Sequence, residues 1–172
     1  MTHYVALLRA VNVGGTGKLP MSDLKAMGEA LGFATVRTWI ASGNLVFTSS
    51  KTEGEVKAAL EAKLASYAGK PVPVFVRTDL ELMDILAADP FPDAIGARSM
   101  VFFFDTAPPV DVVTNIKGLQ GERLARGVRE IYIDYGANIR DTKLKFSAMK
   151  TGTGRNMNTV RKLAGLAQAA PR

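Results

Sequence analysis

The order of apolar patterns in the first 78 residues constrains the fold of this chain more than any other feature. Four short runs rich in apolar and β-branched residues have the character of strands, and two longer segments carry apolar residues at helical spacing. The strand-like runs are 4–11, 35–41, 45–48 and 72–78, and the helical segments are 21–31 and 52–67. The order β-α-β-β-α-β is typical of a ferredoxin-like unit, so we predict one over residues 1–78.

Residues 79–172 repeat part of that order. The expected strands are 100–105, 122–127 and 130–135, and the expected helices are 80–87, 109–117, 143–149 and 157–168. The strand, helix and hairpin from 100 to 135 follow the sequence of elements in the first half. We therefore predict an α+β fold of two ferredoxin-like (β-α-β-β-α-β type) halves, 1–78 and 79–172, with an extra C-terminal helix.

The scarcity of reactive side chains excludes several kinds of chemistry. The chain of 172 residues contains no cysteine and one histidine, His3. Disulfides, thiol nucleophiles and thiolate or multi-histidine metal sites are excluded, and a Ser-His-Asp triad would depend on a histidine at the edge of the first strand. We predict no metal site, and neither a cofactor nor a reaction follows from the composition.

The amino terminus lacks the features of a targeting segment. No basic region precedes the first apolar run, and Arg9 interrupts that run. It has neither the pattern of a signal peptide nor that of a membrane span. We therefore expect a cytoplasmic protein with no membrane partner.

Positive charge is concentrated near the C-terminus. The formal net charge is +6, with a net of −1 over residues 1–119 and +7 over residues 120–172. Such asymmetry favours acidic partners, either phosphorylated small molecules or nucleic acid. A basic surface that is merely solvated remains the alternative.

The first polar motif runs from Arg9 to Gly15. It places Arg9 near the end of a strand and Asn12, Gly14 and Gly15 in a loop that leads into a helix. Glycine lets backbone N–H groups approach an anion, and the amino end of a helix favours negative charge. A Walker A loop is excluded because Asn12 and Leu19 stand where it needs glycine and Ser or Thr. An ordinary glycine-rich turn is the alternative.

The second motif is Ser42-Gly43-Asn44, between two expected strands. A tight hairpin turn explains these residues without a ligand, since glycine and asparagine tolerate positive φ. We expect this hairpin and the Arg9 loop to project from opposite ends of the sheet, which counts against a shared site unless the second half folds over that end.

The third motif, Arg155-Asn156-Met157-Asn158-Thr159, is expected to open the last helix. Either asparagine could cap that helix. Arg155 has no capping role, and a guanidinium beside free N–H groups and hydroxyls suits a phosphate or carboxylate.

Together with Leu7-Leu8, Pro20-Met21 and Val36-Arg37-Thr38, the three motifs make the chain resemble the DUF1697 family, whose function is unassigned. The resemblance implies two related α+β halves. The family usually has glycine at Ala10 and tryptophan at Met157. Here Ala10 argues against a positive φ, and Met157 removes an aromatic platform. The matching residues that the resemblance implies for the site are Arg9, Asn12, Gly14, Gly15, Ser42, Gly43, Asn44, Arg155, Asn156, Asn158 and Thr159.

The favoured hypothesis is that the protein binds a small anionic, phosphate-bearing ligand such as a nucleotide. Arg9 and Arg155 would pair with its charge, and the asparagines would orient it. One alternative is a nucleic-acid-binding module that uses the basic C-terminal third. Another is a protein-interaction module whose polar motifs are caps and turns.

Overall fold

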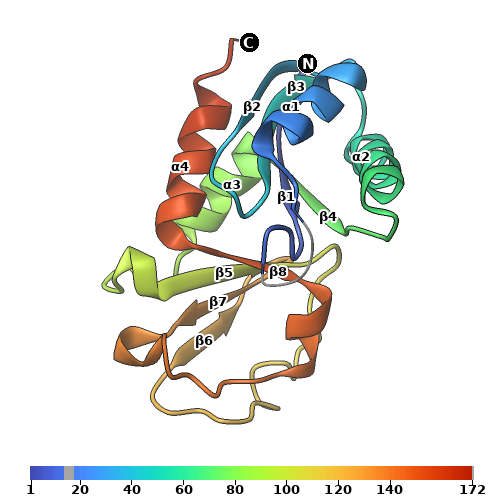
Figure 1. Ribbon diagram of the computed structural model, residues 1–172. Helices are drawn as coiled ribbons and strands as arrows, with labels where there is room; N and C mark the ends of the chain where they lie inside the picture. Colours follow the sequence, from blue (N-terminus) through green and yellow to red (C-terminus); the bar gives the residue numbers. More distant parts are fainter. Residues whose placement is uncertain (14–17, 172) are drawn as a thin grey trace. The chain divides into compact units, whose positions relative to one another are not determined.

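The computed structural model describes residues 1–13 and 18–171, which form two compact units (Figure 1). Unit 1 comprises residues 1–83 and 163–172, and unit 2 comprises residues 84–162. Across the described residues the fold is mixed α+β, with two four-stranded antiparallel sheets and four α-helices. None of those helices combines the length and apolar character needed to cross a membrane.

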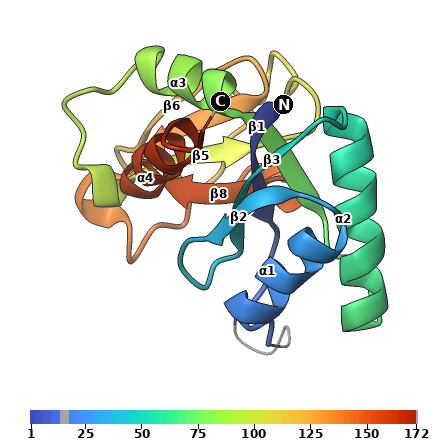
Figure 2. The same ribbon diagram turned by 90° about the horizontal axis from the view of Figure 1, so that it is seen from above.

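Unit 1 confirms the predicted order of elements. It contains β1 (Thr2–Leu8), α1 (Met21–Ala30), β2 (Ala34–Thr38), β3 (Asn44–Ser49), α2 (Glu53–Ala68) and β4 (Val74–Thr78). Neighbouring strands are antiparallel in the order β2-β3-β1-β4. Helices α1 and α2 cover one face of this sheet (Figure 2).

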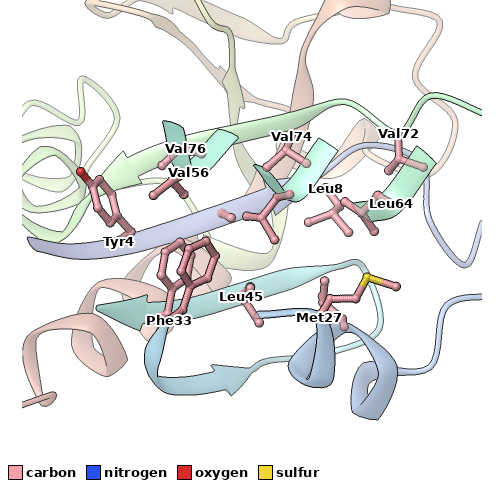
Figure 3. Packing of buried hydrophobic residues seen from close by; sticks show 14 of the residues in the cluster. Tyr4, Leu8, Met27, Phe33, Leu45, Val56, Leu64, Val72, Val74 and Val76 are labelled. Carbon is pink, nitrogen blue, oxygen red and sulfur yellow. The ribbon is translucent and has the colours of Figure 1, made fainter. Parts of the chain in front are cut away.

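The core of unit 1 lies between that face and the two helices. Alternate residues of the central strand, Tyr4, Ala6 and Leu8, meet Leu24 from α1 and Leu60 from α2. Figure 3 shows Leu64 and Val72 near Leu8, at the end of the cluster away from Tyr4. Burying side chains of this size stabilises the fold by roughly 1.5–3 kcal/mol each.

Local signals set the ends of α2. Thr52 and Glu55 form a reciprocal capping box: the Glu55 N–H donates to the Thr52 hydroxyl, and the Thr52 N–H donates to the Glu55 carboxylate. Gly69 ends the helix in the left-handed conformation, with φ of 71°. The chain then runs through Pro71 and Pro73 into β4.

Unit 2 contains the second sheet. Its strands are β5 (Ser99–Phe103), β6 (Arg123–Arg126), β7 (Glu130–Asp134) and β8 (Thr153–Asn156), in the order β6-β7-β5-β8. Helix α3 (Asp79–Ala87) begins in unit 1 and ends in unit 2, whereas α4 (Met157–Gln168) begins in unit 2 and ends in unit 1. Short 3₁₀ turns occupy Gly96–Arg98, Gly136–Asn138 and Ser147–Thr151.

Two predictions for this unit are wrong. Residues 109–117, all described, form turns at 110–114 and an isolated bridge from Lys117 to Lys145 rather than a helix. The run of β-branched residues that follows Pro108 and Pro109 has low helix propensity, and the turns close through bonds such as Val112 N–H to the Pro109 carbonyl. The helix expected at 143–149 is also absent, and a 3₁₀ turn forms at Ser147–Thr151 instead.

Strand β8 was not predicted at all. Its sequence, Thr-Gly-Arg-Asn, lacks apolar alternation, and it pairs only with β5 along an edge of the sheet. Long-range pairing therefore imposes the strand on a sequence whose local pattern does not indicate one.

Candidate functional site

A pocket of about 620 Å³ lies in unit 1, beside the end of β1. Three segments line it: residues 9–11 after β1, residues 18–19 before α1, and the end of α2 with the connection to β4. We call it the Arg9 pocket. Every residue that lines it belongs to unit 1.

Three cationic side chains line the Arg9 pocket. Arg9 is half-buried, and Lys18 and Lys70 are exposed. Among the described residues that line it, none is acidic. Three positive charges without a lining carboxylate raise the local potential, which favours an anion.

The backbone at Arg9 is held on the β4 side. The Arg9 N–H donates to the Pro73 carbonyl over 3.0 Å, so the loop leaves β1 alongside the start of β4. Lys70 precedes this contact on the connection, directly after the Gly69 helix end. The close approach of these two segments explains how cations 61 positions apart line one pocket.

Ala10 has a φ of 55°, so the expectation that it would not adopt positive φ is wrong. The left-handed conformation costs a residue with a Cβ roughly 1–2 kcal/mol. Asn12 adopts the same conformation, with φ of 54°. Two such residues beside the pocket mark a tightly constrained loop.

The floor of the Arg9 pocket is apolar. Val11, Leu19, Leu64 and Val72 line it, and each is buried in the core of unit 1. Figure 3 shows Leu64 and Val72 at this end of the core. The pocket therefore combines a cationic rim with an apolar floor, which suits a ligand that has both a charged and an uncharged part.

Asn12 closes the base of the first loop. Its Nδ2 donates to the carbonyl oxygens of Leu19 and Ala41, each over 2.8 Å, and its Oδ1 accepts from the Leu19 N–H over 2.7 Å. These bonds hold both ends of the loop and tie it to the segment before β3. They give Asn12 a structural role. Gly14 and Gly15, predicted for the same site, lie outside the described residues.

The second motif lies beside the first, and the expectation that they project from opposite ends of the sheet is wrong. The Leu8 N–H donates to the Gly43 carbonyl over 2.9 Å. Because β1 and β3 are antiparallel neighbours, the start of β3 adjoins the end of β1, with Leu7 opposite Asn44. Two of the three motifs therefore meet in unit 1.

Gly43 is required at that contact. Its φ is 89°, and a Cβ there would lie 2.6 Å from Val11 Cγ2 and 2.9 Å from Leu8 Cβ. Asn44 is fully buried, and its Nδ2 donates to the Trp39 carbonyl and to the Ser42 hydroxyl. These contacts explain the motif as a turn that supports the Arg9 loop, outside the pocket itself.

Arg155 lies on β8 rather than at the free amino end of a helix. Its side chain is 6% exposed, and Nη1 donates to the Thr153 hydroxyl over 2.8 Å and to the Gly154 carbonyl over 2.9 Å. Burial lowers the pKa of Arg155 to about 10, so the guanidinium is charged at neutral pH. Arg155 thus contributes a buried charge to unit 2.

The other members of the third motif surround the start of α4. Asn156 Oδ1 accepts from the Thr159 N–H over 2.9 Å, which is a capping bond. Asn158 is exposed, and its Oδ1 lies 3.4 Å from Arg161 Nη1. Of the two asparagines predicted as possible caps, Asn156 makes the capping bond.

Several basic residues of unit 2 have partners within the unit. Arg123 forms ion pairs with Asp93 and Asp134. Arg126 donates to the Pro108 carbonyl, and Arg129 donates to the Asp105 carbonyl. Part of the C-terminal positive charge therefore forms ion pairs and hydrogen bonds within unit 2.

His3 is buried in unit 1. Its Nδ1 lies 2.7 Å from the Ala167 carbonyl oxygen and 3.8 Å from Asp79 Oδ2. These contacts join β1 to the end of α4 and to the start of α3. Within residues 1–13 and 18–171, no group of three or more His, Asp or Glu side chains is arranged to hold a metal ion.

Comparisons with known proteins place the chain in a family. The model of the family described as "Protein of unknown function (DUF1697)" matches residues 1–132. The chain belongs to the DUF1697 family. A search of curated proteins found no match. The structure of the conserved bacterial protein SP0830 from Streptococcus pneumoniae is similar, with a TM-score of 0.80 and 24% identity over 96% of this chain and 98% of that chain. That similarity concerns the fold.

In this DUF1697 protein, three residues that line the Arg9 pocket with a charged or hydroxyl-bearing side chain are absent from the predicted site. They are Lys18, Tyr67 and Lys70. Lys18 follows the glycine loop, which was a usable signal. Tyr67 and Lys70 had none, because only packing decides which residues at a helix end face the loop after β1.

Proposed function

We propose that this DUF1697 protein binds a small phosphate-bearing anion in the Arg9 pocket. The observation that carries the proposal is the joint presence of Arg9, Lys18 and Lys70 in one pocket whose described lining has no acidic side chain. Phosphate oxygens accept several charge-assisted hydrogen bonds, and each such bond contributes about 1.5–3 kcal/mol.

Among these cations, Arg9 is the best placed to orient the ligand. Its backbone is held by Pro73, and its guanidinium offers a planar fork that matches a phosphate. The two lysines add two further positive charges, and both are exposed. This arrangement supports binding, and we assign no reaction to it.

The remaining predicted site residues have supporting roles in this proposal. Asn12, Gly43 and Asn44 set the path of the loop that carries Arg9. Ligand binding by Ser42, Gly14, Gly15 and the Arg155 motif stays a prediction, as does the cytoplasmic location.

We also propose a ferredoxin-like fold for unit 1. The strand order β2-β3-β1-β4, with α1 and α2 on one face, supports it for unit 1. In unit 2 the order β6-β7-β5-β8 is analogous, but turns replace the first helix. We infer that the two units are related, with the second reduced.

The test is equilibrium titration with inorganic phosphate and pyrophosphate, using the natural chain and the variants Arg9→Gln and Lys70→Gln. Lys63→Gln is the matched control, because Lys63 is exposed on α2 and does not line the pocket. We expect each pocket variant to weaken pyrophosphate binding by about tenfold and the control to leave it unchanged.

The same titration with a short RNA separates the alternatives. Nucleic-acid binding by exposed Lys143, Lys145 and Lys150 would weaken steeply with salt and would not respond to Arg9→Gln. Equal pyrophosphate binding by the natural and Arg9→Gln chains would overturn the proposal, and RNA binding of this kind beside it would favour the nucleic-acid-binding module. Failure of both anions and RNA to bind would also overturn it and would favour a protein-interaction module.

A further inference from the structure

The wall of the Arg9 pocket includes one aromatic ring. Tyr67 lies on α2 and lines the pocket, and 47% of its surface is exposed. Its hydroxyl donates to Asp23 Oδ2 on α1 over 2.8 Å. A bond at the tip of the side chain restricts the ring, so less freedom is lost when a ligand packs against it.

The hydroxyl also stays neutral. The hydrogen bond to Asp23 raises the pKa of Tyr67 above its ordinary value, with burial as a smaller cause. At neutral pH the ring therefore adds no negative charge to a pocket that has three cations. Its exposed surface is available for contact with an uncharged part of a ligand.

Tyr67 belongs to a strip of uncharged residues that leads toward the cations. Leu64, Tyr67 and Ala68 have the helical spacing i, i+3 and i+4, Pro71 follows the end of α2, and all four line the pocket. Lys70 lies on the same connection. The pocket thus places an aromatic and apolar wall beside its cationic rim.

The size of the pocket exceeds the needs of a bare phosphate ion. Its volume of about 620 Å³ lies within the range of roughly 300–1,000 Å³ that is usual for sites of larger organic ligands. A phosphate held only at the rim would leave the Tyr67 wall and the floor unused. The extra space and its lining favour a ligand that also has an uncharged, flat or apolar part.

We infer that the ligand is a nucleotide whose base stacks on Tyr67 while its phosphate lies among Arg9, Lys18 and Lys70. This inference rests on the proposed function and adds the class of ligand. Every base has a π-face, so stacking on one tyrosine predicts preference for nucleotides over sugar phosphates with little choice among bases.

The experiment is calorimetric titration of the natural chain with AMP and with ribose 5-phosphate, which has the sugar and phosphate but no base. We expect AMP to bind about tenfold more tightly, the factor that one stacked base contributes. In Tyr67→Leu the two affinities should become equal, with ribose 5-phosphate unchanged. Tyr67→Phe keeps the ring and should retain most of the preference.

The outcomes separate the two proposals. If AMP and ribose 5-phosphate bind equally to the natural chain, or if Tyr67→Leu keeps the preference for AMP, the base does not stack on Tyr67 and this inference fails while the phosphate site stands. If neither binds, both proposals fail. The thermal midpoints of Tyr67→Leu and Tyr67→Phe report whether either variant has lost its fold, and the Phe variant keeps the test valid if the Leu variant does not fold.

Discussion

Arg9 and Arg155 belong to motifs of similar composition, and the structure gives them opposite environments. Arg9 is half-buried at a pocket with two lysines. Arg155 is 6% exposed on a strand and donates to groups one and two residues away. Glycine, arginine and asparagine together thus indicate a constrained backbone, whereas exposure decides whether the arginine can meet a ligand from solvent.

The asparagines show the same contrast. Asn12 bridges segments that are distant in sequence, through Leu19 and Ala41. Asn156 caps the helix that follows it. The first motif is therefore held by tertiary contacts and the third in part by local ones, so matched substitutions in the two motifs should differ in measurable ways.

The largest expected difference concerns the two arginines. Arg155→Ala should lower the free energy of unfolding by about 3 kcal/mol, because it removes a buried side chain and leaves the Thr153 hydroxyl and the Gly154 carbonyl without this donor. Arg9→Ala should change it by less than about 0.5 kcal/mol. Urea unfolding measures both.

Arg155→Met serves as the volume control and should cost less than Arg155→Ala, because it refills most of the space with apolar atoms. A stable Arg155→Ala variant that no longer binds pyrophosphate would reverse the comparison and make Arg155 a ligand residue.

Two glycines give the next contrast. Gly43→Ala should cost about 2 kcal/mol, since φ is 89° and the new Cβ would overlap the side chains of Val11 and Leu8 near the backbone. Gly154→Ala should cost about half as much, because its Cβ would meet the flexible end of Met100 and the edge of Phe102. Thermal unfolding ranks the two, and equal costs would contradict the tighter packing of the first motif.

The next difference concerns Asn12 and Asn156. Asn12→Ala should lower the free energy of unfolding by about 2 kcal/mol, because it removes the bonds to Leu19 and Ala41. It should also weaken phosphate binding, because it displaces the loop that carries Arg9. Asn156→Ala should cost about 1 kcal/mol, the usual effect of a lost helix cap. Phosphate titration of both variants tests the difference. Unchanged binding in Asn12→Ala would show that the bonds of Asn12 do not position the residues of the Arg9 pocket.

The smallest effect has the opposite sign. Ala10→Gly should raise the free energy of unfolding by about 0.5 kcal/mol, because relief of the left-handed strain exceeds the entropy that glycine adds to the unfolded chain. Ala41→Gly is the control: Ala41 is exposed and not at positive φ, so the same change should destabilise. A destabilising Ala10→Gly would show that the contacts of the methyl group outweigh the strain.

Strongly periodic segments were predictable. The last helix has the predicted bounds, Met157–Gln168, because apolar residues recur on one face. The β-α-β-β-α-β order of unit 1 follows from patterns of the same strength. Residues 109–117 and β8 were mispredicted or missed because their local patterns are weak and turns or long-range pairing decide their structure.

For the candidate site, the sequence indicated Arg9 and a loop with special backbone conformations. The conformation of Ala10 was not predictable, because an alanine adopts positive φ only where neighbouring contacts impose it. The adjacency of the Arg9 loop and the Ser42 turn depends on the antiparallel pairing of β1 with β3. Tyr67 and Lys70 join the site through the packing of the end of α2.

The amino-acid pattern alone therefore specifies the α+β class, the element order of unit 1, the last helix and the polar segments, because short-range periodicity and turn chemistry act within a few residues. Packing alone decides that Arg155 is buried, that Arg9 lines a pocket and that Lys18, Tyr67 and Lys70 line the same pocket. These features depend on residues up to 61 positions apart. Burial and strand register bring such residues together, and no local sequence pattern specifies either of them.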